Sequence, residues 1–95
     1  ELLTAIRLDP DNTRSYEAIG AVYLNLKLFE KSICYLEKAL LMGGNRQILY
    51  NNLAVAYFFK GEADKALEYI SLAEKLGIRL NPDMVQTIKS VSGRQ

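Results

Sequence analysis

The sequence predicts an all-α fold in which helix-turn-helix units repeat and stack as a right-handed α-solenoid. The main observation is an offset of 34 residues at which tyrosines recur, Tyr16 with Tyr50 and Tyr23 with Tyr57. A constant period of about 20 to 50 residues is typical of repeat arrays, whose units bury their apolar faces against one another. The second observation is that no segment shows the alternating apolar pattern of a β-strand.

The period divides the chain into two complete units and two partial ones. Residues 13–46 and 47–80 are the complete units, residues 1–12 match the end of a preceding unit, and residues 81–95 begin a further one. Terminal repeats are usually atypical, so the last segment is interpreted as a partial repeat or a capping helix. Since the chain opens without Met and inside a unit, we expect it to be a piece of a longer repeat protein.

Turn residues and helix caps place the individual helices. Asn12 is a candidate N-cap, and Asn81-Pro82 combines an N-cap with a proline at the first helical position. Gly61 suits a left-handed C-cap between two helices. Together with the apolar periodicity, these signals predict helices over residues 1–8, 13–26, 29–42, 47–59, 63–76 and 82–92.

The recurring residues share one face of the first helix of a unit. Tyr16, Ile19, Gly20 and Tyr23 follow the spacing i, i+3, i+4, i+7, which puts side chains on one side of a helix. A glycine inside a helix costs about 1 kcal/mol relative to alanine, so Gly20 needs a packing reason. We expect that the missing Cβ lets the next helix approach closely. These residues are therefore predicted to build the core and not to carry function.

The recurring pattern resembles the tetratricopeptide repeat, a helix-turn-helix unit of about 34 residues. The first unit supplies Tyr16, Ile19, Gly20, Tyr23, Ser32, Leu36 and Ala39, and the second supplies Tyr50, Leu53, Ala54, Tyr57, Ala66, Ile70 and Ala73. The chain departs from the family pattern where Tyr replaces the usual Trp, where Ser32 takes a small Ala position, and where Gly44 and Ile78 replace the closing Pro. The resemblance implies a protein-binding scaffold and not an enzyme.

Composition argues against several other classes of function. Twelve Lys and Arg against 11 acids give a net charge of +1, which provides no basic field for nucleic acid or an anionic membrane. No run approaches the roughly 20 apolar residues of a membrane span. The chain has no His and one cysteine, Cys34, which is expected to be a partly buried structural thiol. We predict no cofactor, no metal and no catalysis, and a cytoplasmic location.

The resemblance further implies a concave groove that holds an extended peptide or a partner helix. The first helices of successive units line it. By repeat phase, the groove residues are Arg14, Glu17, Ala18, Ala21, Leu24 and Asn25 in the first unit, Ile48, Asn51, Asn52, Val55, Phe58 and Phe59 in the second, and Gln86 and Lys89 in the last helix.

Two neighbouring pairs in this set call for a choice. The carboxamide of Asn52 both donates and accepts, so it can pair with a peptide backbone, although a surface or inter-helix role fits equally well. Asn51 is expected to face solvent or to pack between repeats. Phe58 and Phe59 point about 100° apart on a helix and cannot both be core. We expect Phe58 to face the groove.

Three functions are weighed. The first is a scaffold that binds another protein or peptide in the groove, and the second is a module that forms homo-oligomers through its terminal helices. The third, RNA binding, would require more cations than Arg14 opposite Glu17. One branch of the family clamps a chaperone's C-terminal carboxylate with Lys and Asn side chains and an Arg. Only Asn52 matches that set, and Glu17 would repel a carboxylate, so this ligand is disfavoured.

Overall fold

The structure is a computed structural model that describes residues 12–92. This part of the chain is built from α-helices without a strand, so the predicted all-α fold is confirmed. Every predicted helix within it agrees with the structure to one residue at either end, whereas the helix predicted over residues 1–8 lies outside the described residues. The helices are α2 (Thr13–Asn25), α3 (Phe29–Leu41), α4 (Arg46–Lys60), α5 (Ala63–Lys75) and α6 (Pro82–Ser92).

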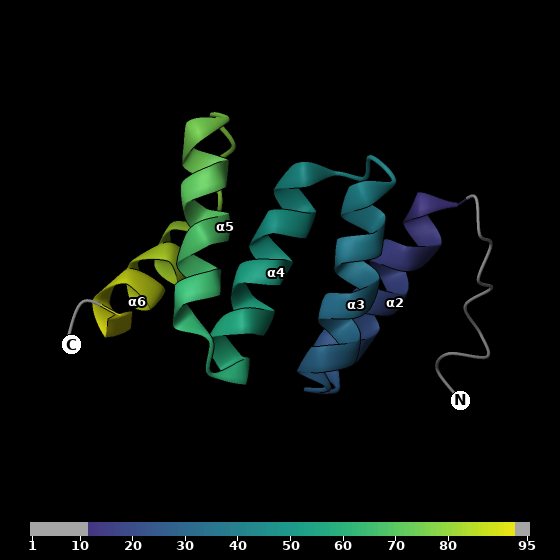
Figure 1. Ribbon diagram of the computed structural model, residues 1–95, viewed down its shortest axis with the longest axis horizontal. Helices are drawn as coiled ribbons and strands as arrows, with labels where there is room; N and C mark the ends of the chain where they lie inside the picture. Colours follow the sequence, from purple (N-terminus) through teal and green to yellow (C-terminus); the bar gives the residue numbers. More distant parts are fainter. Residues whose placement is uncertain (1–11, 93–95) are drawn as a thin grey trace.

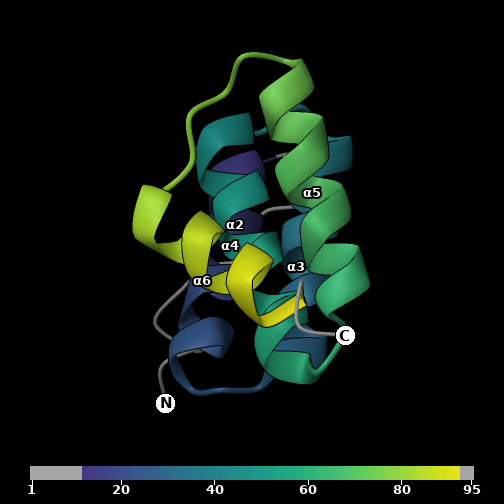
Figure 2. The same cartoon turned by 90° about the vertical axis from the view of Figure 1, so that its left-hand side faces the viewer.

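The helices α2 to α5 stand side by side in chain order (Figure 1). Each packs against the next, so that the core is a continuous layer between successive helices. The helix α6 lies at the C-terminal end of the array, inclined to the other four, and packs on α5 (Figure 2). The largest side chains that are fully buried are Leu36, Leu49, Leu53, Ile70 and Ile88.

The tyrosines predicted as core form the same cluster in both units. In each, the second helix contributes a tyrosine whose ring lies against two tyrosines of the first helix. The ring centroids of Tyr35 lie 6.1 Å from Tyr16 and 5.6 Å from Tyr23. The corresponding distances from Tyr69 are 5.7 Å to Tyr50 and 5.8 Å to Tyr57. The four first-helix tyrosines are buried, as their spacing predicted.

The caps that the sequence predicts are confirmed. Asn12 accepts a hydrogen bond from the backbone N–H of Arg14 at 3.0 Å. Asn81 accepts from the N–H groups of Asp83 and Met84 at 2.9 and 3.1 Å and starts α6. Gly61 ends α4 in the left-handed conformation, with φ of 96°. These local signals fix where the helices begin and end.

One prediction is wrong. Cys34 is exposed on α3, not partly buried. It lies two residues from both Ser32 and Leu36, which are fully buried. Two residues correspond to about 200° around a helix, so Cys34 points away from the face that Ser32 and Leu36 bury.

Candidate functional site

An exposed stripe runs along α4 on the face opposite its core residues. Ile48, Asn52, Val55 and Phe59 follow the spacing i, i+4, i+7, i+11, which keeps side chains on one side of a helix. Ile48 is 47% exposed and Phe59 62%, whereas Asn52 and Val55 are half-buried. The repeat-related residues of α2, which contacts α4, are also exposed or half-buried. They are Arg14, Ala18, Ala21 and Asn25.

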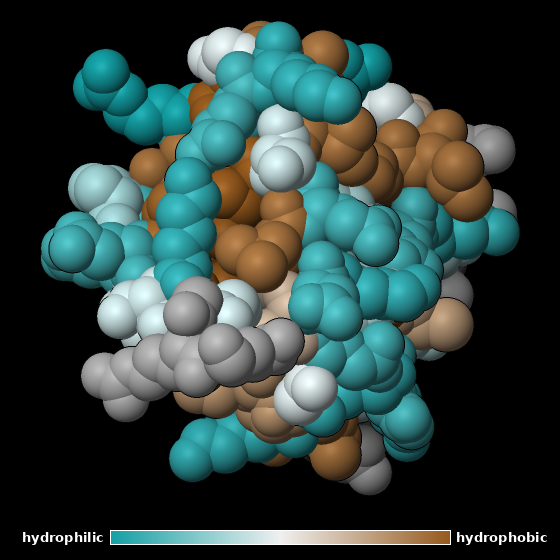
Figure 3. Space-filling view, turned by 60° about the vertical axis from the view of Figure 1, so that its left-hand side comes forward, coloured by the Kyte–Doolittle hydropathy of each residue, from teal (hydrophilic) through white to brown (hydrophobic). Residues whose placement is uncertain are grey.

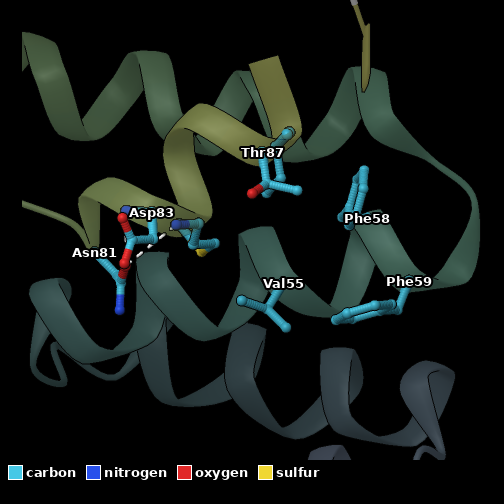
Figure 4. A pocket seen from close by; sticks show the side chains of 8 residues that line it. Val55, Phe58, Phe59, Asn81, Asp83 and Thr87 are labelled. Carbon is cyan, nitrogen blue, oxygen red and sulfur yellow. Dashed lines mark hydrogen bonds between the residues drawn. The ribbon is translucent and has the colours of Figure 1, made fainter. Parts of the chain in front are cut away.

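A hollow of about 360 Å³ lies between α4 and α6, and we call it the α4–α6 hollow. In Figure 4, Val55, Phe58 and Phe59 border it from α4, while Asp83 and Thr87 border it from the α6 side. Its other lining residues are Asn81, Met84 and Ile88. The floor is therefore apolar and the rim polar. On the side of the molecule where α5 and α6 come forward, apolar atoms gather in patches between hydrophilic ones (Figure 3).

The α4–α6 hollow includes two residues of α6, Met84 and Thr87, that the sequence did not predict as groove residues. Met84 and Thr87 are 34 residues beyond Tyr50 and Leu53, which are buried, so their repeat phase indicated core positions. In the structure Met84 is half-buried and Thr87 is exposed. Their place in the hollow follows from how α6 sits on α4 and α5, and no local pattern in the sequence signals it.

The side chains of the neighbours Asn51 and Asn52 differ in their hydrogen bonding. The Oδ1 atom of Asn51 accepts a hydrogen bond from the backbone N–H of Asn81 at 3.1 Å. Gln47, one turn earlier, donates from Nε2 to the carbonyl of Arg79 at 2.8 Å. Asn51 and Gln47 thus hold the loop that enters α6. The side chain of Asn52 forms no hydrogen bond with any residue in the described part of the chain, so its carboxamide is available to a ligand.

Glu17 in the first unit and Asn51 in the second each accept a hydrogen bond from the backbone at the start of the following unit. The two residues are 34 positions apart, and Oε2 of Glu17 accepts from the backbone N–H of Asn45 at 2.9 Å. Asn45 is the N-cap of α4, and its side chain accepts from the N–H of Ile48 at 3.1 Å. The carboxylate of Glu17 is therefore occupied in positioning α4.

The two adjacent phenylalanines differ in burial. Phe58 is half-buried, packs against the core and lines the α4–α6 hollow. Phe59 is the more exposed one, and its ring stacks on Phe29 of α3 with 5.8 Å between centroids. Leu24 of α2 is half-buried against the core. Phe59 thus forms the outer wall of the hollow, and Phe58 forms part of its floor.

Gln86 and Lys89 do not line the α4–α6 hollow. The Nζ atom of Lys89 forms an ion pair with Oε2 of Glu74 on α5 at 2.8 Å. Gln86 lines a neighbouring hollow on α6 with Ser90, Val91, Asp83 and Thr87, and the last two also border the α4–α6 hollow. The inclination of α6 accounts for this difference from the repeat phase (Figure 1).

The clearest electrostatic cluster lies elsewhere, between α3, α4 and α5. Oε2 of Glu37 accepts from the hydroxyl groups of Tyr57 at 2.7 Å and Tyr69 at 3.1 Å. Burial raises the pKa of both tyrosines, and the charge of Glu37 and its hydrogen bonds raise these pKa values further. Among residues 12–92, no three His, Cys, Asp or Glu side chains are grouped so as to hold a metal ion. None of the described helices combines the length and the apolar character needed to cross a membrane.

A model of the tetratricopeptide repeat matches residues 13–42 and 48–76, which is more than half of the chain. The chain belongs to the tetratricopeptide repeat family. The family is a non-catalytic scaffold whose domains generally mediate protein–protein interaction.

Among solved structures, the chain is similar to the N-terminal domain of stress-induced protein-1 (STI-1) from C. elegans, with a TM-score of 0.70. The identity is 23%, and the likeness covers 94% of this chain and 74% of that one. At this identity the likeness shows a shared fold. No curated protein sequence matches the chain.

Proposed function

We propose that the chain binds a peptide segment of another protein along the exposed stripe of α4, with one apolar side chain of the segment in the α4–α6 hollow. The observation that carries this proposal is the hollow itself, with Val55, Phe58 and Met84 as an apolar surface and Asp83 and Thr87 at its rim. Peptide-binding sites commonly combine an apolar pocket for an anchor side chain with a few polar groups that orient the ligand. No catalytic step is assigned to the chain.

The size and composition of the hollow favour a peptide over a cofactor. Its volume of about 360 Å³ is near the lower end of the range for ligand pockets, about 300 to 1,000 Å³. That space suits one or two large side chains. Next to it, Asn52 offers a donor and an acceptor, which match the N–H and C=O of an extended backbone. The segment would then be held by its backbone at Asn52 and by an anchor residue in the hollow.

The experiment is a selection of peptides from a phage-displayed library of random dodecapeptides, followed by affinity measurements on variants. Val55→Asp places a charge in the hollow and should weaken the selected peptides about tenfold or more. Asn52→Ala should weaken them by a smaller factor. Ser71→Asp adds the same charge on the exposed face of α5 and serves as the control. Circular dichroism shows whether each variant keeps its helices.

Two results would overturn the groove proposal. The first is that selection yields no peptide that binds the chain. The second is that every selected peptide binds Val55→Asp and the parent with equal affinity. In either case the α4–α6 hollow is not the contact surface.

A second candidate function, self-assembly through the terminal helices, has one observation in its favour. The apolar side chains of Leu72 on α5, Leu76 directly after α5 and Val91 on α6 are 44, 51 and 47% exposed. Burying such a surface between copies would stabilise an oligomer. Light scattering over about a hundredfold range of concentration tests this, because association follows mass action. A dimer that Leu76→Glu dissociates would favour self-assembly, and a monomer throughout would exclude it.

A further inference from the structure

The turn between α2 and α3 differs in chemistry from the equivalent turn between α4 and α5. The repeat offset aligns Leu26-Lys27-Leu28-Phe29 with Lys60-Gly61-Glu62-Ala63. Both turns have the same backbone: the second residue is left-handed, with φ of 63° in Lys27 and 96° in Gly61. The backbone N–H of Leu28 donates to Tyr23 at 2.9 Å, and that of Glu62 donates to Tyr57 at 2.8 Å. The turn between α4 and α5 adopts this backbone conformation without Leu26, Leu28 and Phe29, so the conformation does not require apolar residues at those positions.

Lys27 carries a conformational cost that the fold does not require. Among residues 12–92 it is the only non-glycine residue with positive φ. A side chain destabilises this left-handed region, which is why glycine usually occupies it. No carboxylate of the described residues lies within 4 Å of its ammonium group. Because strained backbone positions cluster at functional sites, Lys27 is a candidate for a role outside the fold.

The first turn borders a hollow of about 430 Å³, which we call the turn hollow. Its apolar wall is made by Leu28, which is 44% exposed, by Phe59, which is 62% exposed, and by Phe29. Its other lining residues are Lys27, Glu30, Lys31 and Lys60. The corresponding hollow at the second turn is lined by Gly61, Glu62, Ala63, Asp64, Lys65 and Glu68, and it has no large apolar side chain.

The cations around the turn hollow are not equivalent. Lys60 is held by Glu62 at 2.8 Å and lies 3.8 Å from Glu30. The ammonium of Lys31 lies 5.6 Å from the ring centroid of Tyr23, a contact that Lys65 repeats with its own tyrosine in the second unit at 5.7 Å. Lys60 and Lys31 therefore have partners within the fold. Lys27 has neither a carboxylate within 4 Å nor an aromatic ring beneath its ammonium group among the described residues.

We propose that the turn hollow is a second protein-binding site, which takes a partner segment carrying an aromatic or large aliphatic side chain next to carboxylates. The apolar side chain packs between Leu28 and Phe59, and a carboxylate pairs with Lys27. Three lysines, Lys27, Lys31 and Lys60, line the turn hollow against the one carboxylate of Glu30, so charge complementarity favours an acidic partner over a basic one. The site is separate from the α4–α6 hollow and shares only Phe59 with it.

The test uses the random dodecapeptide library on phage, selected on the parent chain at low salt. One enriched class should combine acidic residues with an aromatic or large aliphatic residue. Leu28→Glu should weaken this class about tenfold or more. Lys27→Gly should weaken it about threefold, the scale of one exposed ion pair, while raising the melting temperature. Misfolding cannot explain a loss of binding in a variant that is more stable than the parent.

Val55→Asp separates this site from the groove. It should leave the affinity of the acidic class unchanged while weakening the peptides that bind the α4–α6 hollow. If the groove proposal fails, the acidic class should still be found and should still respond to Leu28→Glu.

Several results would overturn the second site. One is that selection yields no acidic class, and another is that the acidic peptides bind Lys27→Gly and Leu28→Glu as tightly as the parent. A third is that the parent binds phosphatidylcholine vesicles containing phosphatidylserine, and no peptide, in a manner that Leu28→Glu abolishes. That result would assign the turn hollow to a membrane surface. A dimer that Leu28→Glu dissociates would assign it to a second copy of the chain.

Discussion

A Cβ atom built on Gly20 would lie 2.6 Å from Cδ2 of Leu36, so α2 and α3 cross at a distance that excludes even alanine without repacking. Leu36 is fully buried, so its side chain is enclosed by the core at this crossing. At the same crossing, the hydroxyl of Ser32 on α3 donates a hydrogen bond to the carbonyl of Gly20 on α2 at 2.8 Å. The second unit makes the equivalent crossing with Ala54 and Ala66. The close approach predicted for Gly20 is confirmed in the first unit.

Gly20→Leu should destabilise the chain by about 1–3 kcal/mol or more, because the new side chain would overpack a buried crossing. Urea unfolding followed by circular dichroism measures the change. Ala18→Leu introduces the same side chain at an exposed position of α2 and should change stability by less than about 0.5 kcal/mol. Equal unfolding midpoints for Gly20→Leu and the parent would contradict the crossing described above.

Asn51→Ala should cost about 1 kcal/mol, because it removes the acceptor for the backbone N–H of Asn81. Asn52→Ala should cost less than about 0.5 kcal/mol, because the side chain of Asn52 has no hydrogen bond within the described part of the chain. Urea unfolding of the two variants makes the comparison, and hydrogen exchange should report faster opening of α6 only in Asn51→Ala. Similar losses in both variants would show that Asn52 also supports the fold.

Alkaline pH should destabilise the chain through Tyr57 and Tyr69. Burial and Glu37 raise their pKa values in the folded state above the ordinary 10.0. The folded chain therefore holds these protons more tightly than the unfolded chain, so this contribution to stability is complete below about pH 10 and is lost as the pH rises above it. Thermal unfolding at a series of alkaline pH values, together with ultraviolet absorbance of tyrosinate, measures the effect.

Glu37→Gln provides the control for this titration. It removes the negative charge beside both tyrosines, so they should ionise at a lower pH than in the parent, although above the ordinary value because they remain buried. The double variant Tyr57→Phe with Tyr69→Phe should flatten the decline in stability above about pH 10. An unchanged decline in that variant would mean that other groups cause it.

Lys27→Gly should stabilise the chain by about 1 kcal/mol, since glycine adopts the left-handed conformation without the cost that a Cβ imposes. The reciprocal change, Gly61→Lys, should destabilise by a similar amount. A Cβ on Gly61 would meet no atom within 4 Å, so backbone strain alone would be responsible. Urea unfolding of both variants measures these changes in the free energy of unfolding. A loss of stability in Lys27→Gly would show that the lysine side chain supports the turn.

The helices, the repeat and the core of this protein are predictable from its amino-acid sequence alone. The caps at Asn12, Gly61 and Asn81 are local signals, because the side chain or the glycine acts on backbone within three residues of it. The stripe of tyrosines needed only helical periodicity and a fixed offset. Gly20 was recognisable because an interior glycine requires a packing reason.

Which surface residues are available to a partner depends on how the helices pack against one another. Asn51 and Asn52 are the same residue type at adjacent positions, but only Asn51 accepts a hydrogen bond from the backbone of Asn81, 30 residues later in the chain. The exposure of Phe59 and its stacking on Phe29 depend on how two units meet. The turn hollow likewise lies between residues of the first and second units. The inclination of α6 brings Lys89 to Glu74 on α5 and not to the groove residues. These outcomes follow from contacts between distant segments, which neither periodicity nor capping encodes.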